Sequence, residues 1–290
     1  MTTGFDIPQQ KPEGASGTFR LPVILGIVNI TRDSFSDGGR FLAPEAALAH
    51  ASKLVQDGAH VLDLGAAASN PKAEAVAPEE EIARLQPVVA ALMQKGVPLS
   101  IDSTAPAVQR WALKQGVAYL NDIHGFPDPA LYPALAAGRA KLIVMHAVQE
   151  AGNATGVDIP AAAVISRIHD FFASRIAALE AAGIERARLI LDPGMGFFLG
   201  SRAEASFEVL HRLPALKQAF GLPLLISVSR KSFLRRMTNR TPQEAGPATM
   251  AAELFAVFQG ADYIRSHDPA ALTDGLLVWA AALTGNTTSP

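Results

Sequence analysis

Short runs of apolar residues recur along this chain, and each run ends in a polar or charged residue. The eight runs span residues 23–30, 61–65, 99–103, 119–123, 141–146, 189–194, 224–232 and 263–267. Strands that are buried on both faces of a parallel sheet have such near-continuous apolar sequences. The runs therefore predict eight parallel strands with polar side chains at their carboxyl ends.

Ala-rich stretches with helical spacing of apolar residues lie between these runs. Several begin at proline, and glycine directly follows most of them, which is the usual asymmetry of helix ends. The expected helices span residues 44–57, 78–95, 106–115, 161–182, 203–220, 249–259 and 268–283. This alternation predicts an α/β fold, a (β/α)8 TIM barrel, as one domain over residues 21–284 between flexible tails at 1–20 and 285–290.

An open doubly wound sheet has the same alternation of strands and helices. That fold usually carries a Gly-rich phosphate turn directly after its first strand. Residues 31–39 (TRDSFSDGG) do not have the spacing of such a turn. We therefore expect the barrel.

Composition narrows the class of protein further. Of the 290 residues 49% are hydrophobic and 18% are charged, and the net charge is −2, so neither a nucleic-acid partner nor a membrane surface is expected. No cysteine is present, which excludes disulfides, a thiolate nucleophile and cysteine-bound metal. The first twenty residues lack the apolar stretch of a secretion signal, and we expect a cytoplasmic protein.

Four strand ends place complementary polar groups at the predicted barrel mouth: Asp102, Asn121, Asp192 and Lys231. A carboxylate accepts paired N–H bonds from a ring nitrogen and its exocyclic amine, and lysine donates to a ring carbonyl. This set fits a guanine-like or pterin ring better than a sugar or a keto acid.

The last two strands add an anion site. Arg265 and His267 follow the eighth run and residues 229–232 end the seventh, where barrels of this type commonly bind phosphate. Asn29 and Asp33 supply oxygen ligands of the kind that Mg²⁺ shares with substrate phosphates. The sequence thus indicates a phosphorylated substrate with Mg²⁺.

Each of these residues also has a simpler interpretation. An aspartate at a strand end can cap the following helix, and a lone lysine or arginine is usually solvated. Lys231 could alternatively form a Schiff base, as in an aldolase. The prediction depends on the whole set of residues.

Three motifs resemble those of the dihydropteroate synthases: residues 26–39 (GIVNITRDSFSDGG), 191–194 (LDPG) and 229–232 (SRKS). Asp63, Asp102 and residues 121–123 and 265–268 match other strand ends of that family, and the resemblance covers residues 22–284. It implies condensation of 6-hydroxymethyl-7,8-dihydropterin diphosphate with p-aminobenzoate, with Mg²⁺ as cofactor, in a homodimer.

The resemblance also assigns roles to residues of this chain. The catalytic residues it implies are Asp33, Asp63, Lys231 and Arg265. The pterin-binding residues are Asp102, Asn121, Met145, Asp192 and Lys231. The diphosphate-binding residues are Asn29, Ser69, Arg265 and His267, with Asn29 also holding the metal. The p-aminobenzoate pocket contains Phe35, Phe197, Arg230 and Ser232.

Two segments depart from the common pattern of that family. Residues 65–71 (GAAASNP) carry Asn70 where an arginine is usual, and residues 195–200 (MGFFLG) replace a shorter turn. With residues 125–129 (GFPDP) they resemble the sulfonamide-insensitive (Sul-type) branch. We hypothesise that Phe197 narrows the p-aminobenzoate pocket against sulfonamides. The alternative is that Phe197 only fills the core.

Two further functions share the pterin-binding residues. One is a pterin-dependent methyltransferase barrel, which has no use for a diphosphate site. The other is a pterin-binding protein without activity, which would not need Asn29 or Asp33.

Overall fold

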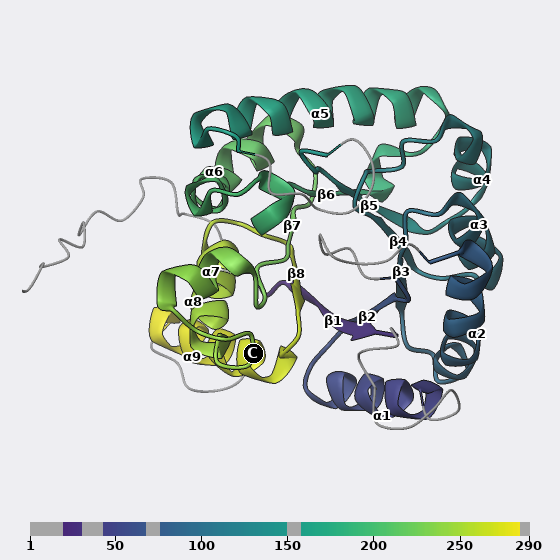
Figure 1. The fold of residues 1–290 in the computed structure, drawn as a ribbon, viewed down its shortest axis with the longest axis horizontal. Coiled ribbons are helices and arrows are strands. Elements are labelled where there is room, and N and C mark those ends of the chain that lie inside the picture. Colours follow the sequence, from purple (N-terminus) through teal and green to yellow (C-terminus); the bar gives the residue numbers. More distant parts are fainter. Residues whose placement is uncertain (1–19, 31–42, 68–75, 150–157, 285–290) are drawn as a thin grey trace, which may run out of the picture.

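The computed structural model describes residues 20–30, 43–67, 76–149 and 158–284. Within them lies an eight-stranded parallel sheet in the order β6-β5-β4-β3-β2-β1-β8-β7. A bridge between Leu191 and Leu224 joins its two edges, so the sheet curls into a ring (Figure 1). The strands are β1 (Val23–Asn29), β2 (Val61–Gly65), β3 (Leu99–Asp102), β4 (Tyr119–Asp122), β5 (Lys141–Met145), β6 (Leu189–Asp192), β7 (Leu225–Ile226) and β8 (Tyr263–Ser266). The predicted (β/α)8 barrel is confirmed.

Helices surround this ring on the outside (Figure 1). They are α1 (Ala43–Gln56), α2 (Pro78–Gln94), α3 (Pro106–Gln115), α4 (Tyr132–Ala137), α5 (Ala161–Ala181), α6 (Ala203–Phe220), α7 (Ser232–Thr238), α8 (Gly246–Phe258) and α9 (Pro269–Thr284). Short 3-10 turns are η2 (Pro129–Leu131), η3 (Arg186–Arg188) and η4 (Gly196–Leu199). None of the helices described is long and apolar enough to cross a membrane.

Local signals at the helix ends explain why most predicted helices agree with the structure. Helix α3 begins at Pro106, which needs no N–H partner there, and ends at Gly116 in a left-handed conformation with φ of 79°. The N–H of Gly116 bonds the carbonyls of Ala112 and Leu113. Helices α4 and α7 were not predicted, because six and seven residues are too few to display a helical period.

The seventh predicted strand is wrong in its length. Residues 224–232 were expected to be extended, but β7 stops at Ile226 and pairs with β8 at only two positions. The chain then turns, with Arg230 at φ of 57°, and α7 starts at Ser232. Residues 227–231 therefore lie in a turn at the mouth of the barrel, without a strand partner on β8.

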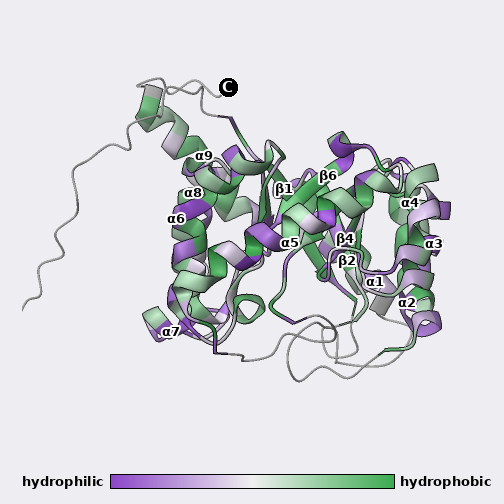
Figure 2. Ribbon diagram, turned by 90° about the horizontal axis from the view of Figure 1, so that it is seen from above, coloured by the Kyte–Doolittle hydropathy of each residue, from purple (hydrophilic) through white to green (hydrophobic). Residues whose placement is uncertain are grey.

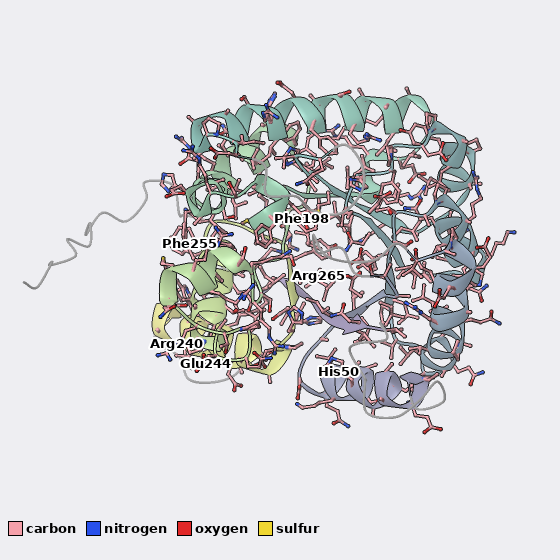
Figure 3. The ribbon with its side chains drawn as sticks, viewed as in Figure 1. His50, Phe198, Arg240, Glu244, Phe255 and Arg265 are labelled. Carbon is pink, nitrogen blue, oxygen red and sulfur yellow. The ribbon has the colours of Figure 1, made fainter. Side chains whose placement is uncertain are left out.

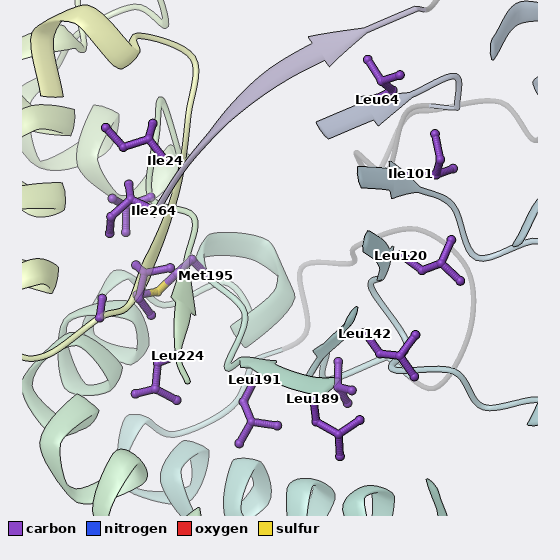
Figure 4. Close-up of a cluster of buried hydrophobic side chains, with 14 of the residues drawn as sticks. Ile24, Leu64, Ile101, Leu120, Leu142, Leu189, Leu191, Met195, Leu224 and Ile264 are labelled. Carbon is purple, nitrogen blue, oxygen red and sulfur yellow. The ribbon is translucent and has the colours of Figure 1, made fainter. Parts of the chain in front are cut away.

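Two clusters of the apolar core follow the alternation of strand residues. The larger part lies between strands and helices and includes Ile24, Leu64, Ile101, Leu120 and Leu142 (Figure 4). The helices show apolar faces toward the strands and polar faces outward (Figure 2). The smaller part fills the inside of the barrel with Leu25, Val61, Ile143, Ile190, Leu225 and Tyr263.

Candidate active site

Six polar residues and Met145 lie two positions beyond the layer of residues that fills the inside of the barrel. Because strand side chains alternate between faces, the residue two positions along a strand points to the same side. In strand order these residues are Asp63, Asp102, Asn121, Met145, Asp192, Ser227 and Arg265. The alternation therefore gathers groups from seven parts of the sheet at the carboxyl end of the barrel.

One pocket at this end brings together all the residues predicted to bind the pterin. Its wall includes Asp102, Asn121, Met145, Asp192, Lys231 and Arg265. Four further residues of the wall were not predicted: Ile123, Met195, Phe198 and Ser227. Ile123, Met145 and Phe198 pack together, so part of the pocket wall is apolar. Such a shape and polarity suit a flat ring with hydrogen-bonding edges.

One lining residue of this site is an arginine with two carboxylate partners. Nε of Arg265 lies 2.5 Å from Oδ2 of Asp63, and Nη2 lies 2.8 Å from Oδ2 of Asp102. Asp63 is fully buried beneath the pocket. Figure 3 places Arg265 in the interior of the ring, with Phe198 near it. The paired carboxylates fix the orientation of the guanidinium group at the mouth of the barrel.

Burial shifts the charge state of the pocket residues toward neutrality. It raises the pKa of Asp102 to about 7 and that of Asp192 to about 6. Burial and the charge of Arg265 lower the pKa of Lys231 to about 8. These three groups therefore titrate near neutral pH, which is common at sites where protons and hydrogen bonds are exchanged with a ligand.

Asn121 presents an acceptor that the protein leaves unused. Its Nδ2 donates to Oδ2 of Asp63 at 3.3 Å, which orients the amide. Its Oδ1 is buried and has no hydrogen-bond partner among the described residues. Since a buried acceptor without a partner is costly, this oxygen is suited to an N–H donor of a bound ring.

The two turns expected to bind diphosphate contact each other. Both N and Nδ1 of His267 lie within hydrogen-bonding distance of Oγ of Ser229, at 3.2 and 3.0 Å. Burial and the neighbouring cations, with Arg265 the largest contributor among them, lower the pKa of His267 to about 3. The imidazole is therefore uncharged, and the positive charge comes from Arg265, Lys231 and the exposed Arg230.

The turn at 195–200 is held from several sides. The N–H of Val148 donates to the carbonyl of Phe198 at 2.9 Å, and Nε2 of Gln149 donates to that of Phe197 at 3.3 Å. The guanidinium of Arg236 on α7 lies 5.4 Å from the ring centre of Phe197. The Phe197 side chain stays partly exposed, whereas Phe198 is buried and its ring centre lies 4.8 Å from Nζ of Lys231.

The β6–η4 connection requires glycine at one position. Gly194 has φ of 77°, and a Cβ atom there would lie 2.4 Å from the carbonyl oxygen of His146. Nδ1 of His146 also lies 3.1 Å from the carbonyl oxygen of Pro193. Burial lowers the pKa of His146 to about 4, so this histidine is a neutral structural group.

The remaining predicted residues lie at the edge of the site or outside the described chain. Asn29 is exposed at the end of β1, and Ser232 is buried at the start of α7 next to Lys231. Asp33, Phe35 and Ser69 lie outside the described residues. In the part of the chain that is described, no three histidine or carboxylate side chains are grouped to hold a metal ion.

The four unpredicted residues of the pocket have weak sequence signals. Phe198 directly follows the predicted Phe197, Met195 comes three residues after Asp192, and Ile123 comes two residues after Asn121. Ser227 lies two positions beyond Leu225, so the alternation of strand residues is the signal that identifies it.

Comparison with known proteins agrees with this geometry. Residues 25–267 match the family described as "Pterin binding enzyme". The chain is 58% identical to dihydropteroate synthase type-2 of Escherichia coli, over 89% of this chain and 95% of that protein. It is 50% identical to the type-3 enzyme of Escherichia coli, over 88% and 97% of the two chains.

Solved structures give the same result. A dihydropteroate synthase from Xanthomonas albilineans in complex with 7,8-dihydropteroate has 37% identity and a TM-score of 0.81, covering 92% of this chain and 95% of that one. The structure of the Xanthomonas albilineans enzyme with 4-aminobenzoic acid also has 37% identity and a TM-score of 0.81, covering 91% and 93% of the two chains.

Proposed function

Because this chain belongs to the dihydropteroate synthases among the pterin-binding enzymes, we propose that it condenses 6-hydroxymethyl-7,8-dihydropterin diphosphate with p-aminobenzoate. The products are 7,8-dihydropteroate and diphosphate, and the reaction belongs to folate biosynthesis. One observation carries the assignment: Asp102, Asn121, Asp192 and Lys231 line a single pocket beside Arg265. All the relatives compared above are dihydropteroate synthases, which favours this activity over the methyltransferase alternative.

The pocket explains how a pterin would be bound. Carboxylate oxygens accept from the ring N–H and the exocyclic amine, Lys231 donates to the ring carbonyl, and Oδ1 of Asn121 accepts a further N–H. Met145 and Phe198 contact the ring from the apolar side. Burial raises the pKa values of Asp102 and Asp192, and N–H donors of a bound ring would act in the opposite direction by favouring the charged carboxylates.

The reaction breaks the bond between the pterin methylene carbon and a diphosphate oxygen and forms a bond from that carbon to the arylamine nitrogen. The amine nitrogen loses one proton, and diphosphate leaves with the electron pair of the broken bond. Arg265, held by Asp63 and Asp102, stabilises the charge that develops on the leaving group. An arylamine is a weak base and reacts in its neutral form, so positioning and exclusion of water contribute more than general-base assistance.

We propose Mg²⁺ as the cofactor. The exposed amide oxygen of Asn29 at the mouth fits a hard cation that takes its other ligands from substrate diphosphate and water. The ion would neutralise charge on the diphosphate. Treatment with EDTA should abolish turnover, and added Mg²⁺ should restore it. Unchanged turnover after EDTA would contradict the role of the metal.

We also propose that the enzyme is insensitive to sulfonamides. Gln149 and Arg236 hold the turn that carries Phe197, and Phe198 of the same turn contacts Lys231. A bulky sulfonyl substituent would therefore clash with a rigid part of the site. The partial exposure of Phe197 argues against a role that is only core packing.

The decisive assay measures dihydropteroate formation from the two substrates with Mg²⁺, titrated with sulfamethoxazole. Turnover that survives drug well above the p-aminobenzoate concentration supports both the activity and the insensitivity. Turnover blocked by the drug at low concentration contradicts the insensitivity alone. Absence of turnover contradicts the proposed activity.

We also propose that the protein is a homodimer in the cytoplasm. Apolar side chains are exposed on adjacent helices α8 and α9, among them Phe255 at 40% and Val278 at 71% (Figure 3 labels Phe255). An apolar patch of this kind is typical of subunit interfaces. Light scattering of the purified protein should give the dimer mass, and Val278→Glu should give the monomer mass. Fractionation of the host cell tests the location.

A further inference from the structure

Helix α8 presents two buried polar side chains toward the site-bearing turns. Thr249 and Glu253 are four residues apart, on one face of the helix, and are 4% and 1% exposed. Helices α7, α8 and α9 lie side by side next to β7 and β8 (Figure 1). Polar groups are costly to bury unless they make hydrogen bonds, so their partners indicate what they do.

Thr249 holds the turn after β7. Its Oγ1 accepts from the N–H of Arg230 at 3.1 Å. Arg230 has φ of 57°, a strained conformation for a residue with a side chain, which persists only where surrounding contacts fix it. Because β7 stops at Ile226, sheet pairing does not fix this turn, and the Thr249 bond supplies a constraint at the residue before Lys231.

Glu253 holds the turn after β8. Its carboxyl group interacts with the hydroxyl of Ser266, which lies between Arg265 and His267, while its Oε1 has no hydrogen-bond partner among the described residues. The same hydroxyl accepts from the N–H of Asp268 at 3.1 Å. Burial, together with the charge of Asp268, raises the pKa of Glu253 to about 8, so the acid is mostly uncharged at neutral pH.

The two turns are joined to each other on the side of the pocket. His267 contacts the hydroxyl of Ser229 through both its N–H and its ring, as described above. A second pocket lies beside these turns and α8, and its wall includes Arg230, Thr249, Glu253 and Asp268. Without the two side chains of α8, the linked turns have space behind them into which they can shift.

We propose that Thr249 and Glu253 are positioning residues that hold the β7–α7 and β8–α9 turns at the distance needed for substrate binding. This rests on the proposed function, in which Arg230 and Ser232 contact p-aminobenzoate and Arg265 and His267 contact diphosphate. Thr249 acts on the first turn and Glu253 on the second. Neither touches substrate.

Kinetics of matched variants test this role. Thr249→Val should raise KM for p-aminobenzoate by about fivefold or more, because a hydrogen bond to a strained turn is lost. Glu253→Leu should raise KM for the pterin diphosphate by a similar factor, while kcat falls less than KM rises in both. Thr249→Ser and Glu253→Gln keep the hydrogen-bonding groups and should stay within about twofold of the wild type. Thr273→Val is the control, because the Thr273 hydroxyl is buried without a hydrogen-bond partner among the described residues.

Hydrogen exchange separates this inference from the proposed activity. The amides of residues 227–233 should exchange faster in Thr249→Val than in the wild type or in Thr273→Val, whether or not the protein is active. Wild-type KM values and wild-type exchange in Thr249→Val would overturn the inference. So would a Thr249→Ser variant as impaired as Thr249→Val. If Glu253→Leu does not fold, Glu253→Gln and the Thr249 pair still decide the matter. If the wild type does not make dihydropteroate, the proposed function is wrong. Hydrogen exchange still tests whether Thr249 holds the turn after β7.

Discussion

Nε of Arg265 lies 2.5 Å from Oδ2 of Asp63, although the two residues are 202 positions apart in the chain. Asp63 is completely buried and Arg265 faces the pocket, so the pair connects the interior of the barrel to the site of chemistry. The proposed stabilisation of the leaving group depends on this anchored guanidinium.

Asp63→Asn should lower both stability and turnover. Removing one partner of a buried ion pair leaves the other charge uncompensated and typically costs about 3–5 kcal/mol, and the retained Asp102 pair reduces this figure. Urea denaturation measures the stability, and kcat at saturating substrate measures the catalytic loss. Glu80→Gln, which removes a half-exposed ion pair with Arg84, is the control and should change stability by less than about 1 kcal/mol. Equal effects of the two substitutions would contradict the role of Asp63.

Pterin affinity should depend on pH with a maximum near neutrality. Below the pKa of Asp192, about 6, the carboxylate that accepts from the ring is protonated, and above the pKa of Lys231, about 8, the donor cation is lost. Calorimetric titration of a non-reacting pterin from pH 5 to 9 measures both limbs. Lys231→Arg keeps its charge throughout this range, so the loss of affinity above pH 8 should disappear in that variant. A wild-type affinity that is flat across the range would contradict the assigned pocket.

The same groups affect stability with a definite sign. The folded-state pKa of Asp102, about 7, lies above its ordinary value of 3.8, so the folded protein binds more protons than the unfolded chain between these values. Its contribution to stability is present below pH 3.8 and is lost as the pH rises to 7. Asp102→Asn should therefore flatten the decline of unfolding free energy over that window, as measured by urea denaturation at several pH values. A parallel decline in both proteins would show that Asp102 does not titrate there.

Phe197→Ala should make the enzyme sensitive to sulfonamides. If the ring narrows the p-aminobenzoate pocket, its loss lowers the inhibition constant of sulfamethoxazole by about tenfold or more, which corresponds to ~1.4 kcal/mol of binding. KM for p-aminobenzoate should change less. The control is Phe207→Ala, an exposed phenylalanine on α6 that packs edge-on against Phe233 away from the pocket. An unchanged inhibition constant in Phe197→Ala would exclude the steric explanation.

Gly194→Ala should destabilise the protein more than the same change at Gly183. Both glycines have positive φ, 77° and 83°, so each substitution carries a backbone cost of about 1 kcal/mol or more. Only at Gly194 does the new Cβ meet a carbonyl oxygen, at 2.4 Å, whereas nothing lies within 4 Å of it at Gly183. Thermal unfolding of both variants measures the difference. Equal Tm values would mean that the η4 turn shifts enough to relieve the clash at Gly194.

Local signals in the sequence were enough for most of the scaffold. Apolar runs, helical spacing and glycine stops are properties of neighbouring residues, and α3 and α6 were predicted with their observed ends for that reason. Where local signals were short or misleading the prediction failed, as for α4, α7 and the end of β7. The polar strand ends were visible as well, since each directly follows its apolar run.

Periodicity and residue type are local properties of the chain, so they specify the barrel and the chemical groups at its mouth. The tertiary structure alone decided which of these groups face one another. Closure of the sheet sets the side on which each strand residue points, and it buries Asp63 against Arg265 and joins Ser229 to His267. Only burial in that shared space brings the pKa values of Asp102, Asp192 and Lys231 toward neutrality. Distances and desolvation depend on residues far apart in the chain, so they arise only when the whole barrel has formed.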